Sequence, residues 1–260
     1  MAEACAEFTE RVLILKTGRF RETDIWVRYF SPSRGVQTAF AFGGCKSRKR
    51  FCGCLDPLNQ VVFKVKCNRT GEYLCLEEGT LVASFPRLRH DFRRLGAAVN
   101  CLKFLEAVQL GAEGAQAAYD LLLDTLGVLD EAEEAPPVLP LLFRARIAFD
   151  QGYVPDFTAC AMCGTQADAA TAFHFMVEQG RVVCGDCLPG VVRADAAHAM
   201  RLPLSGEALK SLEFVCGNPP RDWARLCLSP HVLRECSRTV DSFVQYHMGL
   251  AWDRGGFRRI

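Results

Sequence analysis

Four cysteines stand in two closely spaced pairs in the C-terminal half of the chain. Cys160 and Cys163 form the first pair, Cys184 and Cys187 form the second, and twenty residues separate the pairs. Each Cys-x2-Cys turn can direct two thiolates at one ion, and two such turns complete a tetrahedron of sulfurs. Because protein sulfur fills all four positions, none is left for a reacting water. The spacing therefore predicts structural Zn2+, with an iron–sulfur or redox role and accidental thiols as alternatives.

The segment between the pairs has the pattern of a β-hairpin. Residues 173–177 and 181–183 are mostly apolar and flank Gln179–Gly180, so we expect a zinc ribbon. Gly164 and Gly185 lie in the cysteine turns, where a tight turn can require positive φ. Residues 155–192 hold little hydrophobic mass, so we expect this insertion to need its metal to fold.

No catalytic motif accompanies the cysteines. The chain lacks a GxxxxGK[ST] loop, a strand-linked GxGxxG, HExxH, GxSxG and the HxE…PCxxC deaminase pattern. Its five histidines are scattered without triad or metal spacing. We therefore expect a binding protein and not an enzyme.

The strongest charge pattern is a basic run after a Gly-Gly pair. Lys46, Arg48, Lys49 and Arg50 lie within five positions, and residues 8–52 hold ten basic and three acidic residues, a formal net charge of +7. Such a run can neutralise phosphates and release counterions, or it can simply be a solvated loop. We favour a nucleic-acid contact. Four weaker candidates for that contact are Arg34, Arg19, Arg21 and Lys64.

Aromatic residues near this run leave two interpretations open. Phe20, Trp26, Tyr29 and Phe51 can stack on bases, or they can form the core of the barrel described below.

A second basic cluster opens a long helical pattern. It consists of Arg87, Arg89, Arg93 and Arg94. Cations at a helix N-terminus oppose the helix dipole, so the cluster is not placed for helix stability. It can bind DNA or an acidic protein tail, and an ordinary solvated face is the alternative.

The strands and helices that carry these residues are predicted from the spacing at which apolar residues recur. Five short strands in the first eighty or so residues predict a small antiparallel barrel; they are residues 11–16, 24–30, 36–42, 59–66 and 72–77. From Pro86 onward the period becomes helical. Helices are expected over 88–105, 115–129 and from 139 to near 152, then after Ser205 and after Ser229–Pro230, which have the pattern of N-terminal caps. The Gly255–Gly256 tail is expected to fray.

These elements predict an α+β chain of four segments. They are a barrel at 1–84, a helical domain at 85–154, a zinc-binding insertion at 155–192 and a C-terminal helical part at 193–260. No apolar run reaches about 18 residues, so we expect no membrane span. The N-terminal residues have no signal-peptide pattern, and paired CxxC motifs among fourteen cysteines favour a cytoplasmic protein; the other ten are interpreted as packed thiols.

In order and spacing, the chain resembles the bacterial RecO family of recombination mediators over nearly its whole length. The residues on which this resemblance rests are Val12-Leu13, Arg21–Asp24, Gly35, Lys46–Arg50 before Leu55–Leu58, Arg87–Asp91, Phe143–Arg146 leading to Gly152–Asp156, and Cys160–Gly164. The resemblance implies an OB-fold that binds single- and double-stranded DNA, anneals strands and contacts RecR. It also implies a helical body that engages the C-terminal tail of single-stranded DNA-binding protein.

Together these properties imply help in loading RecA during DNA repair and recombination after DNA damage, in a cytoplasmic, nucleoid-associated protein without catalytic activity. Some family members bind zinc, and the intact quartet places this chain with them. Two alternatives remain: a protein–protein adaptor with a structural zinc and little DNA affinity, and a zinc-dependent nucleic-acid enzyme.

Overall fold

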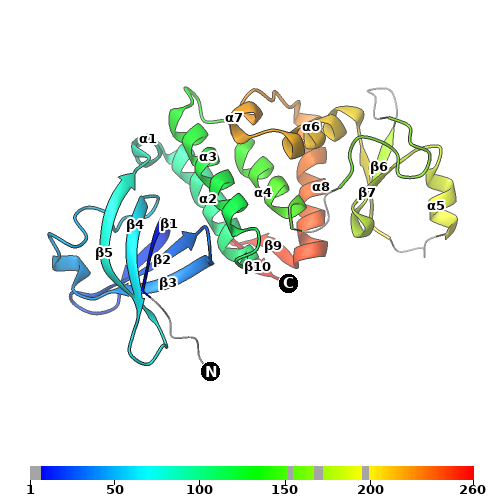
Figure 1. Ribbon diagram of the computed structural model, residues 1–260. Coiled ribbons are helices and arrows are strands. Elements are labelled where there is room, and N and C mark those ends of the chain that lie inside the picture. The colour runs from blue at the N-terminus through cyan, green and yellow to red at the C-terminus, as the bar shows by residue number, and fades with distance from the viewer. Residues whose placement is uncertain (1–6, 152–154, 167–171, 195–198) are drawn as a thin grey trace. The chain divides into compact units, whose positions relative to one another are not determined.

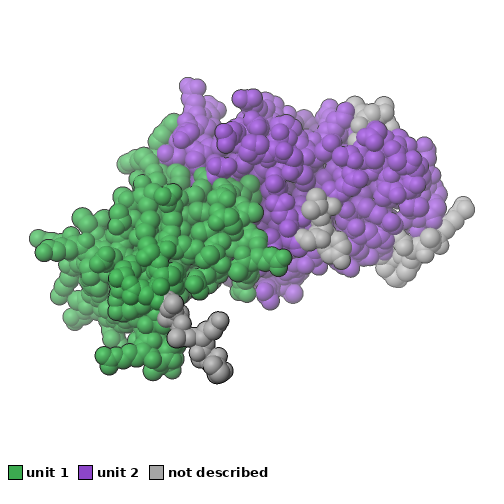
Figure 2. Space-filling model, viewed as in Figure 1, with its two compact units in different colours: residues 1–92, 109–123 green, residues 93–108, 124–260 purple. Residues whose placement is uncertain are grey.

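The computed structural model describes residues 7–151, 155–166, 172–194 and 199–260. The chain divides into two compact units (Figure 2). Unit 1 comprises Met1–Phe92 and Gln109–Leu123, and unit 2 comprises Arg93–Val108 and Asp124–Ile260. The ribbon with the cysteine quartet belongs to unit 2.

Unit 1 is built on a closed five-stranded barrel, coloured blue to cyan in Figure 1. Its strands are β1 (Phe8–Arg19), β2 (Ile25–Ser31), β3 (Gly35–Ala41), β4 (Gln60–Cys67) and β5 (Leu74–Ala83). They close in the order β1-β2-β3-β5-β4, with β3 and β5 parallel and the other neighbours antiparallel. This arrangement is OB-like and confirms the barrel expected from the sequence.

The inside of the barrel is filled by alternate residues of its strands. Tyr29 and Phe63 are fully buried there with ring centroids 5.8 Å apart. On β3 the inward residues are Ala39 and Ala41, both fully buried. The narrow interior therefore takes small side chains from β3 opposite large ones from β2 and β4.

One outer flank of the barrel is covered by the start of helix α3 (Ala115–Glu131) within unit 1. The Phe30 and Tyr119 rings lie 6.1 Å apart, and the Gln60 side-chain amide lies 3.1 Å from the Tyr119 hydroxyl. These contacts bury Phe30 of β2 and Gln60 of β4, which lie on the side of the barrel that faces α3.

The helical pattern beginning at Leu88 is interrupted once, contrary to the single helix expected there. Helix α1 (Pro86–His90) ends before Asp91, whose backbone is extended at φ −127° and ψ 116°, and α2 (Phe92–Val108) follows. An extended aspartate before a helix is a common N-cap conformation, so the chain restarts the helix here.

Three of the remaining helices lie where the sequence predicted them: α4 (Leu139–Phe149), α6 (Gly206–Gly217) and α8 (Pro230–Met248). Two short helices were not predicted: α5 (Leu188–Ala194) and α7 (Pro220–Trp223). Both expected caps are confirmed, because Ser205 Oγ accepts from the Ala208 amide and Ser229 Oγ accepts from the Val232 amide, each at 3.3 Å.

The ribbon shares a hydrophobic core with the helices of unit 2. Strands β6 (Phe173–Met176) and β7 (Arg181–Cys184) form the expected hairpin, and β8 (Arg201–Leu204), which was not expected, pairs with β6. Phe157 packs 5.4 Å from Phe149 of α4, and Phe175 lies 6.1 Å from Phe243 of α8. The ribbon therefore buries apolar side chains against α4 and α8 as well as within its own segment.

The C-terminal tail is a hairpin, so the prediction that it frays is wrong. Strands β9 (Leu250–Asp253) and β10 (Gly256–Arg259) pair antiparallel. Phe257 packs 4.9 Å from Phe104 of α2, and the Lys103 ammonium donates to the Gly255 carbonyl at 2.6 Å. These contacts hold the hairpin against α2. Among the described residues, no helix combines the length and apolarity needed to cross a membrane.

Candidate functional site

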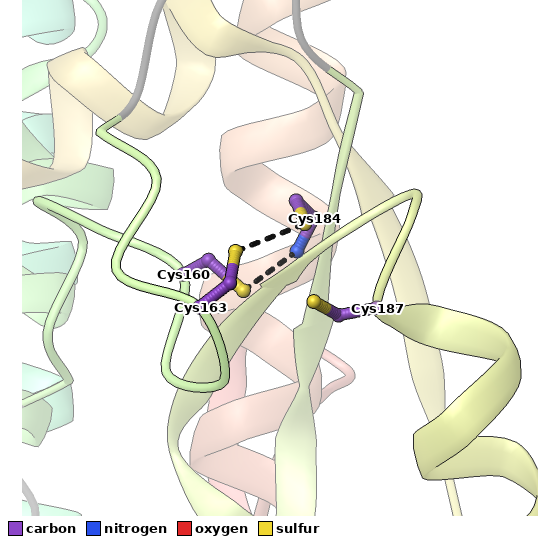
Figure 3. A group of neighbouring side chains, drawn as sticks. All are labelled: Cys160, Cys163, Cys184 and Cys187. Atoms are coloured by element: carbon purple, nitrogen blue, oxygen red, sulfur yellow. Dashed lines mark hydrogen bonds between the residues drawn. The ribbon is translucent and has the colours of Figure 1, made fainter.

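Two loops bring the four predicted cysteine ligands together in unit 2. Cys160 and Cys163 lie in the loop before β6, Cys184 ends β7, and Cys187 immediately precedes α5. Their sulfurs converge on one point (Figure 3) and all lie within 4.8 Å of one another. The Cys163 and Cys184 sulfurs are 3.7 Å apart. A tetrahedron with metal–sulfur bonds of about 2.3 Å has edges of about 3.8 Å, so the quartet fits one metal ion.

Backbone amides orient the first knuckle. The Met162 and Cys184 amides donate to the Cys160 sulfur at 3.4 and 3.3 Å, and the Gly164 amide donates to the Cys160 carbonyl at 2.9 Å. Gly164 has φ +74°, the left-handed conformation that the turn was expected to require, whereas Gly185 has no positive φ. The second knuckle is thus built without a left-handed residue.

The electrostatics of the quartet favour a bound cation. Hydrogen bonds from the Thr165 hydroxyl and amide lower the pKa of Cys163 to about 6. The pKa of Cys187 is raised to about 12 by its hydrogen bonds with Cys163 and Cys184. Without a central cation, the cluster therefore cannot ionise all four thiols near neutral pH. A bound metal ion would replace the remaining thiol protons, and the closed set of four sulfurs suits an architectural ion.

His174 is a strand residue and not part of the cysteine cluster. It lies in β6 opposite Val183 of β7, and burial lowers its pKa. It is therefore a hairpin side chain, as the sequence indicated.

The predicted basic run lies in the loop that follows β3. Lys46, Arg48, Lys49 and Arg50 are all exposed. The Arg50 guanidinium donates to the Phe42 carbonyl at 2.6 Å and lies 5.2 Å from the Phe51 ring. Arg50 is thus fixed beside the end of β3, while the other three cations project from the loop.

The four weaker candidates are dispersed over the barrel. Arg19 is exposed at the end of β1, and Arg21 in the next loop lies 5.6 Å from the Phe20 ring and 3.9 Å from the Asp24 carboxylate. Arg34 is in the β2–β3 turn, 4.2 Å from the Phe8 ring. Lys64 lies on β4 between two carboxylates.

The ion pairs of Lys64 offset its positive charge. Its ammonium lies 2.6 Å from Glu7 and 3.5 Å from Glu77, and the hydrogen bond to Glu7 is the main cause that raises its pKa. The structure therefore places Arg19, Arg21 and the basic run around one end of the barrel, and it does not bring Arg34 or Lys64 to that group.

The structure confirms the core interpretation for two of the four aromatic residues, and base stacking stays a prediction for the exposed one. Tyr29 and Phe51 are buried in the barrel core, and Trp26 is half-buried. Phe20 is 39% exposed and packs with Phe40, 5.1 Å between ring centroids.

Phe20 belongs to a group of rings of which three were not singled out from the sequence: Phe40, Phe42 and Tyr73. We call Phe20, Phe40, Phe42 and Tyr73 the aromatic face. Phe40 is half-buried, whereas Phe42 and Tyr73 are 37% and 39% exposed and lie 6.2 Å apart. The signal that could have found Phe40 and Phe42 is the alternation Ala39-Phe40-Ala41-Phe42 at the end of β3, provided the alanines are assigned to the interior.

The second basic cluster divides into exposed and buried members. Arg87, Arg89 and Arg93 are exposed, and Arg89 donates to the Pro57 carbonyl and the Asn59 side chain. Arg94 is only 5% exposed, and its guanidinium donates to the Leu129 and Glu133 carbonyls at 2.6 and 2.8 Å. Arg94 therefore serves the C-terminal end of α3, and the partner-binding prediction now rests on the other three.

The comparisons with known proteins agree over both parts of the chain. Residues 3–85 match the family described as recombination protein O N terminal, and residues 89–254 match recombination protein O C terminal. A DNA repair protein RecO from Oleidesulfovibrio alaskensis is 49% identical over 254 residues, which cover 98% of this chain and all of that protein.

More distant relatives carry the same name. The DNA repair protein RecO of Maridesulfovibrio salexigens is 44% identical over 98% of this chain and all of its own length. That of Anaeromyxobacter dehalogenans is 28% identical over 91% of this chain and 90% of its own. With both family matches and these full-length relatives, the chain belongs to the recombination protein O family of DNA repair proteins.

Proposed function

We propose that this chain is a DNA-binding recombination mediator that holds DNA on the outside of its barrel. The observation that carries the proposal is the exposed end of the barrel, where the basic run and Arg21 border the aromatic face. Five-stranded OB barrels commonly bind oligonucleotides on this part of their surface. Lys46, Arg48, Lys49 and Arg50 would neutralise phosphates, with Arg19 and Arg21 beside them.

Phosphate neutralisation explains how one surface could serve several DNA forms. Cations read the backbone and not the bases, so single and double strands both qualify as ligands. Screening the charge of two complementary strands on one protein would also favour their annealing. Family membership supports the wider role: RecR and the C-terminal tail of single-stranded DNA-binding protein as partners, and help in loading RecA. Arg87, Arg89 and Arg93 are candidates for an acidic partner tail.

The cysteine quartet would hold Zn2+ for architecture. Its support is the closed set of four sulfurs and a spacing that fits a tetrahedral ion. Bound zinc would supply a crosslink between two loops, and no position would remain for chemistry. The chain would therefore act without catalysis.

The test is a titration of fluorescent single-stranded DNA with the full chain at several salt concentrations. The variant carries Lys46→Ala, Arg48→Ala, Lys49→Ala and Arg50→Ala. A control variant removes the same charge from exposed residues of unit 2, and its substitutions are Lys210→Ala, Arg221→Ala, Arg225→Ala and Arg238→Ala.

The variant in the basic run should bind more weakly to every sequence and show a shallower salt dependence. For single strands the slope of log K against log salt should fall by about 0.7 for each lost phosphate contact. The control should stay near the wild type. Equal losses in both variants would assign the effect to net charge, and absence of binding at low salt would favour the adaptor alternative, in which the chain joins proteins with little DNA affinity.

A further inference from the structure

The aromatic face is an apolar patch on the outside of the barrel, where a strand ordinarily presents polar residues. On β3 the alternation places Ala39 and Ala41 in the core and Phe40 outside, and Phe42, the residue after the strand, continues the outer row. Phe20 contributes from the β1–β2 loop, and Tyr73 from the loop before β5. Ring centroids within the group lie 5.1 to 6.3 Å apart. Grouped exposed rings of this kind mark a binding surface more often than isolated ones do.

The backbone around the rings is held in place before any ligand arrives. The buried Asp24 carboxylate accepts from the Gly43 amide at 2.7 Å, and the Cys45 amide donates to the Thr23 carbonyl at 3.0 Å. These bonds tie the loop that carries Phe20 to the segment that carries Phe42. In the loop before β5, the Asn68 side chain accepts a hydrogen bond from the Tyr73 amide at 3.1 Å. A surface fixed in this way loses little conformational entropy on binding.

An adjoining aromatic extends the same outer surface. Trp26 of β2 is paired in register with Phe40 of β3 and with Gly18 of β1. A Cβ at Gly18 would lie 2.5 Å from the Trp26 ring, so only glycine lets the indole lie flat on β1. The Lys16 ammonium is 5.9 Å from the centre of that indole.

The charges at the edge of the rings identify the occupant. The Arg21 guanidinium lies 5.6 Å from the Phe20 ring, and Arg50 is bonded to the carbonyl of Phe42. Lys46, Arg48 and Lys49 follow in the same loop. The exposed acids in these loops are Glu22, Asp56 and Glu72, three against five cations. Rings bordered by cations suit a ligand with flat apolar faces and a polyanionic backbone.

We propose that the aromatic face stacks unpaired nucleobases, so that the barrel holds a single strand by bases and phosphates but a duplex by phosphates alone. This inference rests on the proposed DNA binding. In a duplex each base is already stacked on its neighbours, whereas an unpaired base offers both faces to a protein ring. Stacking tolerates any sequence because every base has a flat face. Single strands are thereby the preferred ligand of the barrel.

The test compares three fluorescent probes of equal length: oligo-dT, an abasic strand with the same phosphates, and a duplex. The full chain is used as wild type and as the variant Phe42→Ala, Tyr73→Ala, which changes two exposed rings. Phe92→Ala is the matched control, because Phe92 is an exposed aromatic residue of unit 1 outside the aromatic face. A Phe42→Leu variant separates stacking from general apolar contact. Thermal unfolding of each variant checks that the fold is kept.

The wild type should bind oligo-dT more tightly than the abasic strand. The double variant should lose about tenfold or more in oligo-dT affinity because it removes two stacking rings, while its affinity for the other two probes stays unchanged. Phe42→Leu should lose affinity for oligo-dT, and Phe92→Ala should not.

Two results would overturn the proposal while leaving DNA binding intact. One is equal wild-type affinity for oligo-dT and the abasic strand, and the other is an unchanged oligo-dT affinity in the double variant, as expected if the rings contact a protein. Failure of the wild type to bind any probe would instead remove the proposed function itself.

Discussion

Replacing Arg94 by methionine should destabilise unit 2 while leaving DNA binding unchanged. The guanidinium donates to the Leu129 carbonyl in the last turn of α3 and to the Glu133 carbonyl just beyond it. The last carbonyls of a helix have no partner within the helix, so Arg94 supplies one from α2. Methionine keeps the apolar stem and removes both donors.

The cost comes mainly from the Leu129 carbonyl, whose bond to Arg94 is buried, because Glu133 is exposed and its carbonyl can bind water instead. A buried acceptor without a partner costs about 1–3 kcal/mol, so Arg94→Met should lower the free energy of unfolding by about that amount. For a unit of this size about 1 kcal/mol corresponds to roughly 2–4 °C in Tm, so the expected drop is roughly 2–12 °C. Arg94→Lys should lie in between, because an ammonium cannot span both carbonyls in the same way.

The assay is thermal and urea unfolding followed by far-UV circular dichroism, with Arg93→Met as the control. Arg93 is the exposed neighbour, and its replacement should change stability by less than about 1 kcal/mol. Equal stability of the Arg94 and Arg93 variants would refute the structural role of Arg94. A loss of partner binding without a loss of stability would restore the role first expected for it.

Four further results are expected. Cys163→Ser should reduce bound zinc from one per chain to none by elemental analysis and lower Tm; unchanged zinc content would remove the quartet as the site. Burial raises the pKa of Cys101 and of Cys236 to about 12 each. The stability that these two protonated thiols contribute is therefore complete below pH 9 and is lost as pH rises toward 12, at about 1.4 kcal/mol per pH unit for each thiol. The urea midpoint of the wild type should fall from pH 8 to 11, and replacing both cysteines by alanine should reduce this fall. An equal fall in the wild type and the double variant would count against the two thiols as its cause. Ser229→Ala should cost about 0.5–2 kcal/mol because the α8 cap is lost, measured by urea unfolding, and no change would deny the cap. Phe257→Ala should speed amide exchange in β9 and β10, and wild-type protection would contradict the anchoring role of the ring.

Features with local causes could be predicted from the sequence. The five barrel strands follow from apolar alternation between turns, and the caps at Ser205 and Ser229 follow from one side chain and an amide three residues on. The cysteine quartet was also predictable, because each pair is fixed by its own turn and only one non-local pairing remains.

The aromatic face was not predictable because alternation does not say which side of a strand is inside. At the end of β3 the ordinary assignment turns Phe40 and the following Phe42 inward and the alanines outward. The structure shows the reverse, because Tyr29 and Phe63 already occupy the narrow interior. The choice depends on strands distant in the sequence, and no single segment contains it.

The remaining differences also come from contacts between distant segments. Arg94 is buried because the end of α3, thirty-five residues onward, supplies its carbonyl partner. The tail forms a hairpin because Phe257 packs against Phe104 of α2. Local polarity predicted an exposed arginine and a frayed tail, and tertiary packing overrode both.

Photocrosslinking would locate the part of the chain that contacts a single DNA strand. A single strand carrying 5-bromouracil is irradiated with the full chain, and the crosslinked peptides are identified by mass spectrometry. We expect crosslinks in the peptides that contain Phe20, Phe42 and Tyr73, and their loss in the Phe42→Ala, Tyr73→Ala variant. Crosslinks confined to the cysteine ribbon or to the helices of unit 2 would contradict DNA binding on the outside of the barrel.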